Sequence, residues 1–134
     1  MFRKFSWLVL VVAVILGVHF ALQAIIQNGD TKNRKGPDLA KLKQIEAVDP
    51  AHAARVRAGM VKYESICRLC HHSTGQGGKF TPPIAGKTAE GVELMLKLYR
   101  QGVQVGPLTN LMAPWAADLS DEDIRNLASY VDTL

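Results

Sequence analysis

The apolar residues of this chain form one long run and several short stripes at helical spacing. The run is WLVLVVAVILGVHFALQAII, residues 7–26, which holds no formal charge over twenty residues. As a helix it would span roughly 30 Å, the thickness of the hydrocarbon core of a bilayer. We therefore expect residues 1–26 to be an uncleaved N-terminal membrane anchor, a single transmembrane helix. A cleaved signal peptide is the alternative, although its apolar region is usually shorter, about 7–15 residues.

The next segment, residues 27–50, is mostly polar and reads as a linker. It contains Gly29, Gly36 and Pro37, which favour a flexible chain in its first part. Apolar residues then recur at a spacing that would place them on one face of a helix. We therefore expect a short helix beginning near Pro37 within the linker. A linker of this length would tether the following domain close to the membrane.

Residues 51–134 are expected to form the folded domain. The spacing predicts three helices, from residue 51 to about 69, from 88 to 102, and from 120 to 134, with a loop rich in Gly and Pro at 72–87. No segment alternates as a strand, so the fold class is all-α. So small a set of helices buries little apolar surface, and we expect a disulfide, a metal or a large cofactor to complete the core.

Charge is distributed unevenly along the chain, whose net charge is +4. Residues 1–50 carry seven Lys/Arg against four Asp/Glu, whereas residues 51–134 carry nine against eight. The excess of positive charge near the expected anchor suits an anionic lipid surface or an acidic partner subunit. A nucleic-acid partner is not expected, because it would require a basic face on the folded domain.

Both cysteines of the chain lie in one short segment, CRLCH, from Cys67 to His71. A disulfide between Cys67 and Cys70 would close only a very small loop and stabilise little. A redox dithiol normally opens a helix next to strands, whereas this one ends a predicted helix. A structural zinc site would need a second pair of ligands, which the sequence does not offer.

The order of these residues is that of a covalent heme site. In C-x-x-C-H the two thiols bond to the heme, and the following histidine ligates the iron. The sequence therefore predicts one heme c, bound through Cys67 and Cys70, with His71 as an axial ligand of the iron. A heme would also supply the missing apolar core.

From about Ala51 to Leu134 the chain resembles the class I c-type cytochromes of the small bacterial monoheme type. The resemblance lies in the CRLCH motif, in PPIAG at 82–86 and in MAPWAADLSDEDIRNLASYVDTL at 112–134. It implies the class I cytochrome c fold around the heme. It also implies that Met112, expected in a loop before the last helix, is the second axial ligand of the iron.

The same resemblance assigns three further residues. Pro82 would accept, through its carbonyl, the second N–H of the His71 imidazole, and Gly59 and Tyr130 would pack where the first and last helices cross. The family often has glycine where this chain has His72, and we expect His72 to take no part in ligation. His19, inside the apolar run, is a further candidate for a polar contact with a partner or a cofactor.

These residues lead us to expect an electron-transfer protein and not an enzyme. With His71 and Met112 on the iron, no open site remains for a small-molecule substrate, and Met/His ligation raises the reduction potential. We expect a membrane-anchored monoheme cytochrome c in a respiratory or photosynthetic chain, acting either as a tethered shuttle or as the cytochrome subunit of a membrane oxidase, reductase or dehydrogenase. Its partners would then be redox proteins, and its heme domain would face the periplasm at the bacterial inner membrane. A heme-based sensor or a peroxidase-like protein with a labile sixth ligand is the alternative.

Overall fold

The structure, a computed structural model, describes residues 12–23 and 39–134. The chain divides into two units, Met1–Arg34 and Lys35–Leu134. In the first unit, residues 12–23 form a helix with exposed side chains, in which the Gln23 amide lies 3.3 Å from the His19 Nε2 atom. Within the described ranges, no helix is both long enough and apolar enough to cross a membrane. Most of the anchor predicted at 1–26 and the start of the linker lie outside these ranges.

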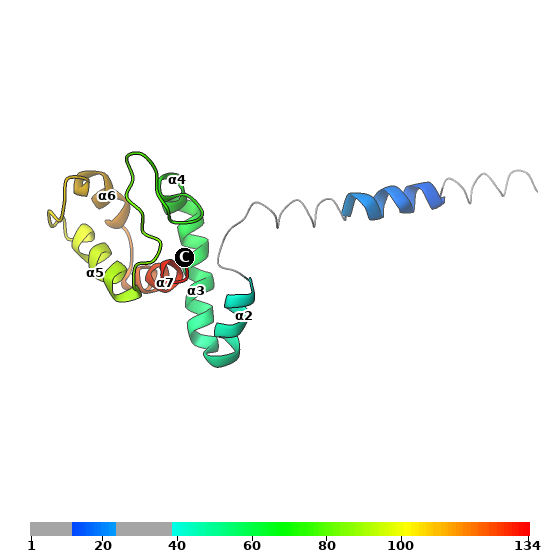
Figure 1. Cartoon of the computed structure of the whole chain (residues 1–134), viewed down its shortest axis with the longest axis horizontal. Coiled ribbons are helices and arrows are strands. Elements are labelled where there is room, and N and C mark those ends of the chain that lie inside the picture. Colours follow the sequence, from blue (N-terminus) through cyan, green and yellow to red (C-terminus); the bar gives the residue numbers. More distant parts are fainter. Residues whose placement is uncertain (1–11, 24–38) are drawn as a thin grey trace, which may run out of the picture. The chain divides into compact units, whose positions relative to one another are not determined.

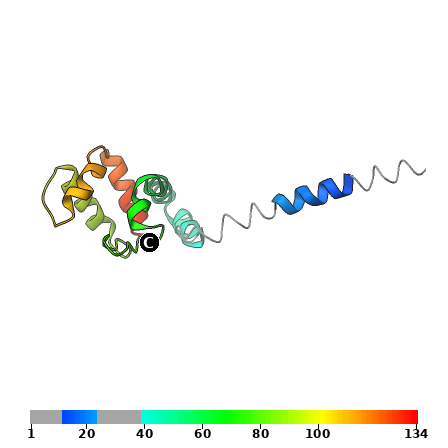
Figure 2. The ribbon, with the colours of Figure 1, turned by 90° about the horizontal axis from the view of Figure 1, so that it is seen from above.

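The described part of the second unit contains helices and loops but no strand. The helices are α2 (Leu39–Val48), α3 (Pro50–Lys62), the π-helical turn η1 (Tyr63–Cys67), α4 (Arg68–His71), α5 (Ala89–Arg100), α6 (Thr109–Ala116) and α7 (Asp121–Val131). Figures 1 and 2 show the packing order, with α2 against α3, α3 against α7, α7 against α5, and α5 against α6. The all-α prediction is therefore confirmed for residues 39–134.

Local capping signals set where these helices begin. The Asp49 carboxylate accepts from the His52 backbone N–H at 2.8 Å, and Pro50 occupies the first turn of α3. At α7 the Ser120 hydroxyl accepts from the Asp123 N–H at 3.0 Å, and the Asp123 carboxylate accepts from the Ser120 N–H at 3.1 Å. This reciprocal pair is a capping box, and the predicted start of the last helix near residue 120 is confirmed.

The structure corrects two predictions about helices. The first predicted helix is present as α3, η1 and α4, which follow one another without a break to His71, close to the expected end near residue 69. Short helix α6 was not predicted, and it places Met112 in a helix and not in a loop. Helix α6 contains Pro114, although proline removes one helical hydrogen bond.

Helix α2 packs on α3 inside the second unit, as the predicted short helix of the 27–50 segment. Leu42 is buried against α3, and Arg57 of α3 forms an ion pair with Glu46 of α2 at 2.5 Å. The Lys41 ammonium donates to the Thr133 carbonyl oxygen at 3.1 Å, which links α2 to the C-terminal end. The compact part of the chain therefore includes α2 together with the helices after residue 50.

The core lies where α3 crosses α7. Its fully buried large side chains are Tyr63, Tyr130, Ile124, Leu127 and Val56. Gly59 makes this crossing possible, since a Cβ atom there would lie 1.9 Å from the Asn126 carbonyl oxygen and 2.9 Å from the Tyr130 Cβ. The predicted pairing of Gly59 with Tyr130 at the crossing is confirmed.

Candidate functional site

The C-x-x-C-H residues lie at the end of the long helical segment that α3 begins. Cys67 closes the π-helical turn, in which the Arg68 N–H bonds to the Tyr63 carbonyl oxygen, five residues back. Cys70 and His71 follow on the single turn of α4. No disulfide joins the two thiols: Cys67 is half-buried and Cys70 is exposed. The sequence fixes the order of the three groups, and the helical turns fix their spacing in space.

His71 is the buried member of this group, with 6% of its surface exposed. Its Nδ1 atom lies 3.2 Å from the Pro82 carbonyl oxygen. Because a carbonyl oxygen can only accept, Nδ1 carries the proton and Nε2 is left with its lone pair for a metal. Burial is the main cause that lowers the pKa of His71, and the hydrogen bond to Pro82 opposes it. Lowering the pKa favours the neutral imidazole, the form that binds iron.

The loop after α4 brings Pro82 to His71. Gly77 has φ 66°, and its N–H donates to the His71 carbonyl oxygen at 3.1 Å. A Cβ atom at Gly77 would lie 2.2 Å from the Thr81 carbonyl oxygen and 2.7 Å from that of Pro82. Only glycine both accepts this backbone angle and leaves room for the returning chain. Gly77 is a site residue that the sequence analysis missed, although its place in a Gly-rich loop was a signal.

The thiol of Cys67 differs from that of Cys70 in its surroundings. Burial raises the pKa of Cys67 to about 11, so the thiol stays protonated at neutral pH. The described residues offer no group of three His, Cys, Asp or Glu side chains that could hold a metal ion.

Met112 lies on α6 with a half-buried side chain. The loop before it is organised by Thr109, whose buried hydroxyl oxygen accepts from the Val105 N–H at 3.1 Å and the Gly106 N–H at 3.0 Å. Thr109 is a second residue that sequence reasoning missed, since a buried threonine has no sequence signal. Helix α6 packs on α5, where Met95 and Leu98 are also half-buried.

Several large apolar side chains near these elements lack protein cover. Leu69 of α4 is 74% exposed, and Leu111 and Trp115 of α6 are 66% and 53% exposed. Covering exposed apolar side chains such as these with an apolar group is favourable. Together with the two free thiols and the His71 lone pair, they fit a large apolar group with a metal centre. The residues present therefore fit a heme.

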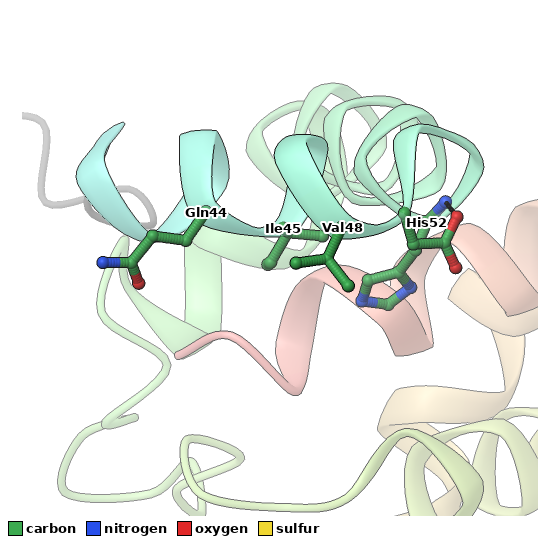
Figure 3. Close-up of a pocket in the computed structure, with 5 residues that line it drawn as sticks. Gln44, Ile45, Val48 and His52 are labelled. Carbon is green, nitrogen blue, oxygen red and sulfur yellow. Dashed lines mark hydrogen bonds between the residues drawn. The ribbon is translucent and has the colours of Figure 1, made fainter.

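A groove at the elbow between α2 and α3 lies apart from this site (Figure 3). It is lined by Gln44, Ile45, Val48, Asp49 and His52 and has a volume of about 340 Å³. His52 and His71 are separated by nearly the full length of the helical segment, about 28 Å at 1.5 Å per residue. His52 is thus not part of the C-x-x-C-H site.

Two features of this helical domain are those of a small monoheme c-type cytochrome. The C-x-x-C-H motif ends a helical segment, and a loop carbonyl orients its histidine. Residues 54–131 match the sequence model of the family described as "Cytochrome C oxidase, cbb3-type, subunit III", and the chain belongs to this family of cytochrome c domains. It carries one heme c, bound covalently through Cys67 and Cys70. It is an electron carrier and not itself an enzyme.

Named relatives support the same class. The chain is 34% identical over 90 residues to cytochrome c-554(547) of Halothiobacillus neapolitanus, which covers 61% of this chain and 99% of the relative. It is 42% identical over 65 residues to cytochrome c-554(548) of Halomonas halodenitrificans, with 48% and 78% covered. It is also 30% identical over 96 residues to the thiosulfate dehydrogenase electron acceptor of Stutzerimonas stutzeri, covering 70% of this chain but 44% of that protein.

Proposed function

We propose that this protein is a membrane-anchored monoheme cytochrome c that passes single electrons between redox proteins, with His71 and Met112 as the axial ligands of the iron. The observation that carries the proposal is the hydrogen bond from His71 Nδ1 to the Pro82 carbonyl, at 3.2 Å. It holds the imidazole as the neutral Nδ1–H tautomer, which leaves Nε2 to ligate the metal.

Heme c would supply a one-electron redox centre, and the chain's residues would hold it and tune its reduction potential. His71 supplies a nitrogen ligand, and the Pro82 carbonyl makes that nitrogen a stronger donor by accepting the other N–H. Met112 supplies a thioether sulfur, which favours the ferrous state relative to a second histidine. With both ligands from the protein, substrates are kept from the iron, and the site transfers electrons without bond chemistry.

The Met112 assignment can be tested with one variant and one control. Met112→Ala should lose the sulfur-to-iron charge-transfer band of the ferric protein and give a high-spin iron that binds CO rapidly when reduced. Met95→Ala is the matched control, because Met95 is a half-buried methionine on the neighbouring helix α5, and it should keep the band. If the wild-type protein lacks the band or binds CO rapidly, the heme-based sensor or peroxidase-like function replaces the carrier function.

The anchor and its orientation belong to the same proposal. The uncharged run at residues 7–26 supports a single span, and the basic residues near it suit a lipid surface. Because heme c is attached outside the bacterial cytoplasm, the heme domain would face the periplasm at the inner membrane. The full chain should stay with the membrane fraction after a high-salt wash; release into the soluble fraction would instead favour a cleaved signal peptide.

The redox partners would be membrane-associated proteins of a respiratory or photosynthetic chain. One relative is named as the electron acceptor of thiosulfate dehydrogenase, which supports a partner dehydrogenase for this chain as well. Purification from gently solubilised membranes would separate the two forms of the proposal. A stable subunit would elute with its complex, whereas a tethered shuttle would elute alone.

A further inference from the structure

His72, the residue after the iron ligand, has a backbone conformation that side chains rarely adopt. Its φ is 59° and its ψ is 167°, a region of φ/ψ space that is essentially restricted to glycine. It is the one non-glycine residue with positive φ in residues 12–23 and 39–134. Such a conformation persists only where neighbouring contacts enforce it.

The strongest of those contacts comes from Tyr63. Its hydroxyl donates to the His72 carbonyl oxygen with an oxygen–oxygen distance of 2.6 Å, and the Gly75 N–H donates to the same carbonyl at 3.2 Å. Tyr63 has no exposed surface, and its ring packs on that of Tyr130 with the centroids 5.0 Å apart. The phenol therefore cannot swing away, and it holds the His72 carbonyl from within the core.

This bond spans the heme-attachment segment. Tyr63 opens the π-helical turn that ends at Cys67, and His72 follows His71 directly. On the N-terminal side of the same residue, the His72 N–H donates to the Arg68 carbonyl at 2.9 Å. The backbone that carries the His71 side chain is thus fixed from the core by Tyr63, while the imidazole itself is fixed from the loop by Pro82.

We propose that Tyr63 is a positioning residue for the iron ligand: through the His72 carbonyl it holds the strained backbone of His72, the residue after the ligand, and so sets the orientation of the His71 imidazole plane. The proposal rests on ligation of the iron by His71. It assigns to His72 a backbone role that does not depend on its imidazole. It also predicts that Tyr63 and His72 are coupled, since the strain at one is held by the hydroxyl of the other.

The test uses Tyr63→Phe in the full heme-loaded protein, with Tyr130→Phe as the matched control. The two rings pack on each other, but the Tyr130 hydroxyl is buried and has no hydrogen-bond partner among the described residues. The readout is proton NMR of the ferric protein, because the spread of the four heme methyl resonances depends on the orientation of the axial imidazole plane. Tyr63→Phe should rearrange the order or spread of these resonances, and Tyr130→Phe should leave them in place.

A second variant separates backbone strain from other causes. His72→Gly, added to Tyr63→Phe, should restore the wild-type methyl pattern, because glycine adopts this conformation without support. His72→Ala should not restore it, since alanine keeps the Cβ atom while losing the imidazole. In denaturant unfolding, Tyr63→Phe should raise the unfolding equilibrium constant about fivefold, the usual effect of one lost hydrogen bond, and by less when His72→Gly is present.

The outcomes distinguish this proposal from the function on which it rests. A lower stability of Tyr63→Phe with an unchanged methyl pattern would reduce Tyr63 to ordinary packing and overturn the proposal. Equal rescue by His72→Ala and His72→Gly would also overturn it. Neither result would affect the assignment of the protein as a cytochrome, which a pyridine hemochrome assay checks separately. If Tyr63→Phe does not fold, His72→Gly alone must raise the unfolding midpoint above that of the wild type. A lower midpoint would refute the claim that the His72 backbone is strained.

Discussion

Gly59 offers the sharpest test of how α3 and α7 pack. In Gly59→Ala, the new Cβ atom would lie 1.9 Å from the carbonyl oxygen and 2.5 Å from the carbonyl carbon of Asn126. Real Cβ contacts essentially never fall below 3.0 Å, so α7 would have to retreat by about 1 Å from α3. The clash is with helix backbone, which cannot rotate aside as a flexible side chain can.

Two opposing effects set the size of the change. Alanine is a better helix former than glycine by about 1 kcal/mol, which would stabilise α3. Overpacking a tightly packed core costs about 1–3 kcal/mol and occasionally more, and a clash with backbone belongs at the upper end. We expect a net loss of about 2 kcal/mol, which corresponds to roughly a 30-fold larger unfolding equilibrium constant.

The assay is guanidinium unfolding of the heme-loaded protein at fixed pH, followed by circular dichroism. The matched control is Gly91→Ala on α5, where an added Cβ would meet only the Thr88 hydroxyl oxygen at 3.4 Å, an ordinary contact. The midpoint of Gly91→Ala should stay the same or rise, while that of Gly59→Ala should fall. A Gly59→Ala midpoint equal to that of the wild type, with an unchanged slope, would refute the account of the crossing.

Two further predictions concern the N-terminal end of α7. Ser120→Ala removes the hydroxyl of the capping box and should lower the free energy of unfolding by about 1 kcal/mol in the same assay. Arg100→Met removes the hydrogen bonds from Arg100 to the Asp121 carboxylate, at 2.6 Å, and to the Leu119 carbonyl, at 2.9 Å. The bond to Arg100 is the main cause that lowers the pKa of Asp121 from 3.8. A carboxyl pKa that is lowered by folding stabilises the fold above the unfolded pKa, and this gain is lost as the pH falls through the folded pKa. Arg100→Met should therefore raise the Asp121 pKa in an NMR titration. It should also make the loss of stability in acid smaller. An unchanged Asp121 titration in the variant would contradict the role of Arg100.

Much of the helical fold was predictable because its signals are local. Asp49-Pro50, Thr88 and Ser120 each cap a helix through groups within three residues, and all three helices begin where these signals place them. Helix α6 was missed because its signal is weak: it is short, holds Pro114 and lacks a side-chain cap. Its position is fixed by packing on α5 and by the bonds of Thr109 to the preceding loop.

The candidate site divides in the same way. The CRLCH motif is readable because its chemistry needs those residues in that order within five positions. The contact between His71 and the Pro82 carbonyl was expected from family resemblance, and the loop built around Gly77 produces it. The hydrogen bond between Tyr63 and the strained His72 was not predicted. Every residue has a backbone carbonyl, so the residue type of the acceptor does not indicate such a bond.

The sequence by itself determined the cofactor, the helix caps and the all-α class of this protein, since each depends on residues that are close neighbours along the chain. Only the tertiary structure decided which distant groups meet: Gly59 against the Asn126 backbone, and the Tyr63 hydroxyl against the His72 carbonyl. Such contacts join helices or loop segments whose approach is set by the packing of the whole domain. That packing cannot be read from residues that are neighbours along the chain. The motif therefore predicts the heme ligand, whereas the orientation proposed for that ligand depends on residues in the core and the loop that the motif does not contain.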